Sequence, residues 1–182
     1  ELGLYRSADW NLSTWLQMPR GRLVWLSRFF PYIDAKFVDA EDRGVLPMDA
    51  DLKEFLINEG LFADKKSLHA QAWYKYQIGI DGNSASDRIY SQLFMGSVVL
   101  IPEGPWKLTS LHSMLKPWVH FVPVRHDLSD LVERLDWLRE NDDQARQIAR
   151  NAVAFAHEYL TCDSILHYVD RLLRAYAEKL TE

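Results

Sequence analysis

The sequence predicts an α/β fold in which an open parallel sheet carries helices on both faces. Strand-like and helix-like segments alternate between residues 74 and 124, which is the order that parallel sheets require. Residues 97–101 are almost wholly apolar, as expected of a strand that is buried on both sides. Amphipathic helical segments follow the last strand and can cover the sheet.

The part of the chain before the sheet is predicted to be mainly helical. Residues up to about 11 are irregular, apolar residues at helical spacing predict a helix over 15–30, and an extended segment or strand follows at 32–37. The polar residues 39–47 are typical of a loop. A helix that contains Leu52 and Leu56 should end at Gly60, and a short helix is expected over 65–73.

The sheet itself is predicted from residue 74 onward. Strands are predicted at residues 76–80, 97–101 and 118–124. Helices are predicted at 86–95, ending at Gly96, and at 106–115, and three more follow, starting at Asp127 or Ser129, at Asp142 or Asp143, and before Ile165. Gly82, Glu103 and Arg125 each lie just beyond a strand. Parallel strands end at one edge of the sheet, so these residues should border a common ligand crevice.

Length and composition narrow the class of protein. A chain of 182 residues without internal repeats predicts one domain over residues 1–182. Its net charge of −5 argues against nucleic-acid binding. The sequence contains no run of 18 apolar residues, so no membrane-spanning helix is predicted. The lone Cys162 excludes an internal disulfide and favours a reducing compartment. The opening at Glu1 does not resemble a natural start, so the chain is expected to be a piece of a longer protein.

The segment from Ile78 to Arg88 is the most informative part of the chain. A β-branched run ends at Gly82, where the backbone can approach a bound group, and hydroxyl residues and Arg88 follow before the apolar positions of a helix. A helix start with free N–H groups and a guanidinium favours phosphate, so one interpretation is a site for the diphosphate of a nucleotide sugar. The alternative is a plain helix cap, because Ser84 and Asp87 fit the capping pattern Ser-x-x-Asp.

Several other site classes are disfavoured. The dinucleotide fingerprint, the P-loop and the nucleophile elbow of hydrolases are absent from the sequence. His112, His120 and His126 lack the spacing of metal ligands, so no metal site is expected.

Three blocks in order resemble glycosyltransferase family 90, which includes Rumi-type protein O-glucosyltransferases, capsule-associated xylosyltransferases and lipopolysaccharide-modifying enzymes. One block is Tyr74-Lys75-Tyr76 with Gly82-x-x-x-Ser86-x-Arg88 and Leu93-Phe94. A more specific block runs from Leu115 to Val124 and continues through Asp127-Leu128-Ser129 to Glu140-Asn141-Asp142-Asp143. The third is Pro19-Arg20, with Leu23, Leu26 and Ser27, and Ile33-Asp34-Ala35.

The resemblance implies the Rossmann-like C-terminal half of a GT-B glycosyltransferase, the lobe that holds the donor. Family members of the Rumi type use UDP-glucose or UDP-xylose and invert the anomeric centre without a required metal. No cofactor is therefore expected beyond the UDP-sugar substrate. The residues that the resemblance and the loop assign to nucleotide-sugar binding are Arg20, Gly82, Asn83, Ser84, Ala85, Ser86, Arg88 and Trp118. Asp87 departs from the family pattern and is expected to point away from the diphosphate.

The family's catalytic carboxylate lies in the N-terminal lobe, so no catalytic residue is assigned in this chain. The expected activity is transfer of a glucose- or xylose-class sugar to a surface glycan such as lipopolysaccharide or capsule. Such an acceptor is compatible with peripheral membrane association. The lone cysteine and the C-terminal sequence favour the cytoplasm, with the ER lumen as the alternative. The alternative function is a non-catalytic carbohydrate- or protein-binding module on the same fold.

Overall fold

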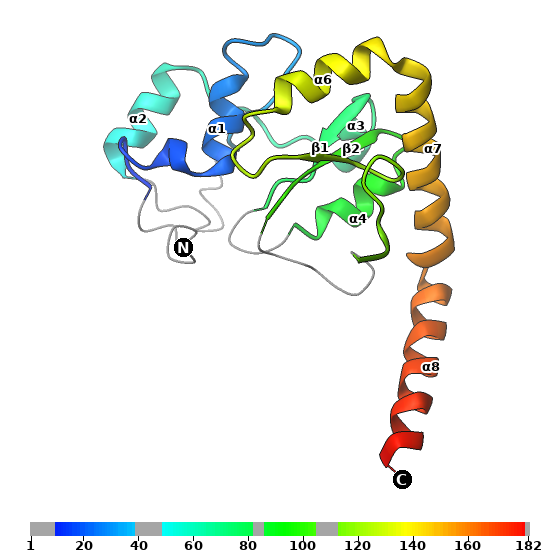
Figure 1. Ribbon diagram of the computed structural model, residues 1–182. Coiled ribbons are helices and arrows are strands. Elements are labelled where there is room, and N and C mark those ends of the chain that lie inside the picture. The colour runs from blue at the N-terminus through cyan, green and yellow to red at the C-terminus, as the bar shows by residue number, and fades with distance from the viewer. Residues whose placement is uncertain (1–9, 39–48, 82–85, 105–112, 181–182) are drawn as a thin grey trace.

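Three parallel strands form the centre of the molecule. The computed structural model describes residues 10–38, 49–81, 86–104 and 113–180, and its sheet has the order β1-β2-β3 (Figure 1). The strands are β1 (Tyr76–Ile78), β2 (Val98–Pro102) and β3 (Val122–Val124). Tyr76 pairs with Val98, and Leu100 pairs with Val122. The predicted open parallel sheet is confirmed, and the carboxyl ends of its strands all lie at the same end of the sheet, which we call its carboxyl edge.

Helices cover both faces of this sheet, as the apolar strand β2 predicts. Val98 and Leu100 pack with α1 (Pro19–Leu26) and α6 (Leu131–Glu140) on one face. Val99 and Ile101 pack with α4 (Arg88–Leu93) on the other. The long helix α7 (Asp142–Tyr159) contributes to both clusters, its first half to the former and its second half to the latter. Alternation of side chains along β2 therefore divides the core into two layers.

The N-terminal helices form a third apolar cluster beside the sheet. They are the 3₁₀ turn η3 (Trp15–Gln17), α1 and α2 (Ala50–Asn58). The short helix α3 (Leu68–Gln71) has no buried residue and contributes none to this cluster. Leu52, Leu56 and Leu61 are fully buried in this cluster together with Trp10 and Trp15. Gly60 has a φ of +64°, which fits the predicted end of α2.

Two predicted elements of this region differ in the structure. The helix expected over residues 15–30 is broken at Met18, whose ψ of 134° is extended, because a proline disfavours helical backbone in the residue before it. Of the two alternatives for residues 32–37, an extended segment or a strand, the strand does not form: the segment contributes one isolated bridge, between Phe37 and Phe62. Residues 1–9 and the predicted loop at 39–47 lie outside the described residues.

The third strand is also shorter than predicted. Residues 118–120 form a turn before β3, and Trp118 has a φ of 62°, a left-handed conformation that no strand can contain. Most of the helix expected over 106–115 lies outside the described residues.

The last helix, α8 (Cys162–Leu180), extends away from the rest of the molecule in Figure 1. None of its residues is buried, although apolar side chains recur along it at helical spacing. Among the described residues, no helix has the length and apolar character needed to cross a membrane.

Candidate functional site

The candidate site lies where the carboxyl ends of the strands meet helix α1. Arg20 reaches the residue that follows β1, because its Nε donates a hydrogen bond to the carbonyl oxygen of Asp81 at 2.9 Å. Arg22 reaches the segment after β3, where its Nη1 donates to the carbonyl oxygen of Asp127 at 3.1 Å. The two arginines thus tie the start of α1 to two strand ends.

The local sequence explains how α1 comes so close. Pro19 occupies the first position of the helix, where its fixed φ is favourable and its missing N–H costs nothing. Gly21 follows, and a Cβ on this residue would lie 2.0 Å from the carbonyl oxygen of Trp15. The glycine lets α1 pack closely against the preceding turn.

Two guanidinium groups interact electrostatically at this edge. Arg20 is partly buried, and burial lowers the pKa of its guanidinium from the ordinary value. The positive charge of Arg88 lowers that pKa further, while the negative charge of Asp81 raises it. Arginine stays protonated despite such shifts, so the pair is a concentration of positive charge that a bound anion would stabilise.

Ser86 and Arg88, at the start of α4, form the side of the site opposite Arg20. Arg88 is the first residue of α4 and is exposed. Ser86 is buried, and its backbone N–H donates to Oδ1 of Asp81 at 2.9 Å. The structure therefore brings together three predicted site residues: Arg20, Ser86 and Arg88. The predicted contacts of Gly82, Asn83, Ser84 and Ala85 lie outside the described residues.

Ser84, the capping residue of the alternative interpretation, lies outside the described residues, so the plain helix cap stays a prediction. Asp87 stands at the N-cap position with helical backbone angles, and its side chain makes no capping hydrogen bond. The helix has only six residues, shorter than predicted, so its dipole contributes less than that of a long helix. The positive character of this edge therefore depends mainly on Arg20 and Arg88.

Trp118 is not brought to this edge. It precedes β3, so it lies beyond the amino ends of the strands, whereas Asp81 and Arg88 lie beyond their carboxyl ends. Its ring meets that of Trp137 at a centroid distance of 4.9 Å, and the guanidinium of Arg134 lies over it at 5.2 Å. Placing Trp118 in the donor site is corrected accordingly: a residue at the start of a parallel strand cannot border the crevice at its end.

Sequence reasoning assigned no role to Asp81, although this residue contacts both sides of the site. The available signal was an Asp-Gly pair directly after a strand, because aspartate at such a position accepts hydrogen bonds from the following backbone. Asp130 plays a comparable part after β3. It is 4% exposed, and its Oδ1 accepts a hydrogen bond from the backbone N–H of Arg125 at 2.8 Å.

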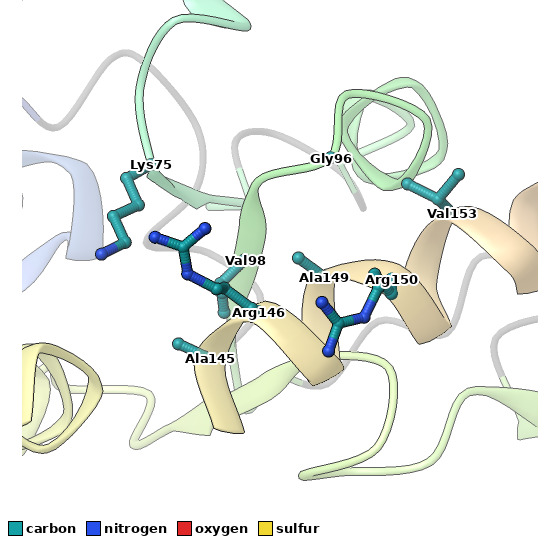
Figure 2. Close-up of a pocket in the computed structure, with 8 residues that line it drawn as sticks. All are labelled: Lys75, Gly96, Val98, Ala145, Arg146, Ala149, Arg150 and Val153. Atoms are coloured by element: carbon teal, nitrogen blue, oxygen red, sulfur yellow. The ribbon is translucent and has the colours of Figure 1, made fainter. Parts of the chain in front are cut away.

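A separate hollow of about 480 Å³ lies at the amino end of the sheet (Figure 2). It is lined by Lys75, Gly96, Val98, Ala145, Arg146, Ala149, Arg150 and Val153. Lys75 and Arg146 both form ion pairs with Asp142, the latter with a 2.8 Å Nε–Oδ2 distance. Two of the three cations of this hollow are already paired with a carboxylate, and it lies away from Arg20 and Arg88.

No group of three or more His, Cys, Asp or Glu side chains in the described ranges is arranged to hold a metal ion.

Comparison with known proteins identifies the family. The model of glycosyl transferase family 90 matches residues 33–182, which is most of the chain. The chain belongs to glycosyltransferase family 90. The matched residues include Asp81, Ser86 and Arg88 at the candidate site, whereas Arg20 lies before the match.

Curated relatives support this assignment over part of their length. Uncharacterized protein 035R of Invertebrate iridescent virus 3 is 39% identical over 120 residues, 65% of this chain and 11% of that protein. Protein O-glucosyltransferase 2 of Danio rerio is 38% identical over 105 residues, 58% of this chain and 21% of that protein. Protein O-glucosyltransferase 1 of Homo sapiens is 37% identical over 108 residues, 59% of this chain and 27% of that protein. The matches thus span roughly a tenth to a quarter of these relatives.

Proposed function

We propose that this chain is the donor-binding part of a glycosyltransferase and that it binds the diphosphate of a UDP-sugar. The observation that carries the proposal is the approach of Arg20 and Arg88 at the carboxyl edge of a parallel sheet. Ligands of open α/β sheets bind beyond this edge. Residues Gly82 to Ser86 connect β1 to α4 there, and we propose that they contact the diphosphate and sugar.

The proposed chemistry is transfer with inversion at the anomeric carbon. The bond from that carbon to the diphosphate breaks as an acceptor hydroxyl attacks from the opposite face, and negative charge develops on the departing UDP. Fixed guanidinium groups stabilise this charge more strongly than water does, which lowers the barrier. The general base that takes the hydroxyl proton would come from outside this chain.

The donor sugar is proposed to be of the glucose or xylose class. Names of curated relatives, which are protein O-glucosyltransferases, support glucose. The proposed acceptor is a surface glycan such as lipopolysaccharide or capsule, and the proposed location is the cytoplasm, peripheral to a membrane, with the ER lumen as the alternative.

We also propose that donor binding requires no divalent metal ion. Arg20 and Arg88 supply positive charge of the kind that a metal ion supplies to a diphosphate in other enzymes. UDP affinity is therefore expected to be unchanged by a chelator such as EDTA.

Calorimetry with UDP and UDP-glucose tests the proposal. We expect the chain to bind both, and Arg88→Ala to weaken UDP binding by about 10- to 100-fold, because a lost charge-assisted hydrogen bond costs about 1.5–3 kcal/mol. The matched control is Arg174→Ala, which removes an exposed guanidinium that pairs with Asp170 on α8. Absence of UDP binding, or equal affinity of Arg88→Ala and the unaltered chain, would contradict the proposal.

A further inference from the structure

Asp81 contacts α1 and the segment before α4, and its carboxylate lies close to the segment after β2. Its carbonyl oxygen accepts the hydrogen bond from Arg20 Nε, on α1. Its carboxylate Oδ1 accepts the N–H of Ser86, two residues before α4. Its Oδ2 faces Gly104, two residues after β2, at 2.8 Å from the position that a Cβ on Gly104 would take. One residue thus connects α1, β1, β2 and the start of α4.

We propose that Asp81 is the positioning residue of the site and that Gly104 is glycine to leave room for its carboxylate. This inference rests on the proposed function, because it concerns how the same residues are prepared for a diphosphate. Asp81 does not itself bind the anion, since a carboxylate repels phosphate. Its side chain acts through Ser86 and Arg88, and its main-chain carbonyl binds Arg20.

The hydrogen bond to Ser86 joins the two described residues on either side of 82–85. A carboxylate that accepts a backbone N–H forms a charge-assisted bond, stronger than one between neutral groups. The bond fixes the separation of residues 81 and 86, and hence the place where α4 begins with Arg88. The same residue holds Arg20 through its main chain. The relative position of the two guanidinium groups therefore depends on Asp81.

Gly104 limits where the Asp81 carboxylate can lie. Among the described heavy atoms, the nearest to the position of a Cβ on residue 104, after Oδ2, are Asp81 Cγ and the Pro102 carbonyl oxygen, both at 4.0 Å. An alanine at 104 would thus conflict with Asp81 Oδ2 and with little else. Since Oδ1 is held by Ser86, movement of the carboxylate away from the methyl group would strain that hydrogen bond.

The test measures binding of inorganic pyrophosphate and of UDP to the chain and to its variants by calorimetry. Asp81→Ala should weaken both by about tenfold or more, in line with loss of a charge-assisted hydrogen bond. Asp81→Asn keeps an oxygen acceptor of the same size and should lose no more than about threefold. Asp136→Ala, at an exposed carboxylate on α6 that lies near Arg139, is the matched control and should bind like the unaltered chain.

A double-mutant cycle separates positioning from general damage to the fold. Gly104→Ala should weaken pyrophosphate binding in the unaltered chain but have no further effect in Asp81→Ala, because the colliding oxygen is then absent. If Asp81→Ala does not fold, the comparison of Gly104→Ala with the unaltered chain carries the test. Full affinity in Asp81→Ala or Gly104→Ala, equal losses in Asp81→Asn and Asp81→Ala, or additive effects in the cycle would each overturn the inference.

The two probes distinguish this inference from the proposed function. Binding of pyrophosphate without preference for UDP, with the pattern of losses above, would support Asp81 as the positioning residue and contradict the UDP-sugar proposal. Binding of UDP that is lost in Arg88→Ala but retained in Asp81→Ala would support the UDP-sugar proposal and contradict Asp81 as the positioning residue. A chain that binds neither probe would contradict both.

Discussion

Two aspartate carboxylates accept backbone hydrogen bonds in the segments that follow the strands. Asp81 accepts the N–H of the residue five positions after it, and Asp130 accepts the N–H of the residue five positions before it. Asp130 is also paired with Arg134 of α6 at 3.1 Å. Each aspartate satisfies a backbone donor that the sheet leaves unpaired, so the segments after β1 and β3 are tied to the helices that follow them.

A pH-dependent contribution to stability is expected at His120. Burial lowers the pKa of this imidazole from its ordinary value of 6.5, and the charge of Lys116 adds to the effect. Its Nδ1 accepts the backbone N–H of Lys116 at 3.0 Å, which requires an unprotonated nitrogen, and its ring packs on Phe155.

The direction in which stability changes with pH follows from proton linkage. Just below pH 6.5 the unfolded chain binds more protons at this residue than the folded chain does, so stability is full above 6.5 and falls as the pH drops through the lower folded-state pKa. Thermal unfolding between pH 7.5 and 5 should show this loss, and His120→Gln should reduce it. An unchanged pH profile in His120→Gln would contradict the assignment.

At the scale of elements, α1 connects the N-terminal cluster to the sheet. Leu23 packs against the sheet, whereas Val24 packs with Trp15 and Leu52 in the N-terminal cluster. The polar residues Arg20 and Arg22 bind the segments that follow β1 and β3. The site arginine is thus held by a helix with apolar contacts on two sides, which reduces the freedom that binding would otherwise have to remove.

Gly21→Ala is expected to destabilise the chain despite the higher helix propensity of alanine. Propensity favours alanine by about 1 kcal/mol. The added methyl group would, however, lie 2.0 Å from a backbone oxygen of Trp15, and overpacking of this kind costs about 1–3 kcal/mol or more.

Urea unfolding should therefore show a lower free energy of unfolding for Gly21→Ala. Gln17→Ala, an exposed change in the neighbouring turn, should stay within about 0.5 kcal/mol of the unaltered chain. A more stable Gly21→Ala chain would mean that α1 does not pack on Trp15 as described.

The burial of apolar side chains differs between α8 and the rest of the described chain. The first half of α7 completes one layer of the core and its second half completes the other. Helix α8 has an equally periodic sequence, yet its apolar side chains are exposed and it projects from the body (Figure 1). The stability of this chain should accordingly depend on α6 and α7 far more than on α8.

A pair of leucine substitutions checks this distribution. Leu138, on α6, is fully buried, and Leu138→Ala should lower the free energy of unfolding by about 2–5 kcal/mol. Leu173, on α8, is 61% exposed, and Leu173→Ala should change it by less than about 0.5 kcal/mol. Chemical denaturation followed by circular dichroism measures both. Similar losses in the two variants would show that α8 is packed in solution.

Much of the fold could be predicted because its signals are local. The apolar run of β2 and the periodic helices α6 and α7 each express their structure within a short window of sequence. The break at Met18 was equally local, since Pro19 was visible, but helical spacing on both sides concealed it. The left-handed turn at Trp118 has no such signal, and the strand was predicted too long as a result.

Local patterns in the sequence were sufficient to predict the parallel α/β class, the family and the position of Arg88 at the start of the helix that follows the first strand. Those properties follow from patterning and motifs, which contacts elsewhere in the chain do not alter. Three features depend on the packing of distant segments: the electrostatic interaction of Arg20 with Arg88, the bonds of Asp81 to Arg20 and Ser86, and the place of Trp118 at the amino end of the sheet. These arrangements join residues far apart in the sequence, such as Arg20 and Asp81, which are 61 positions apart. They depend on how helices pack against strand ends, which no local pattern records.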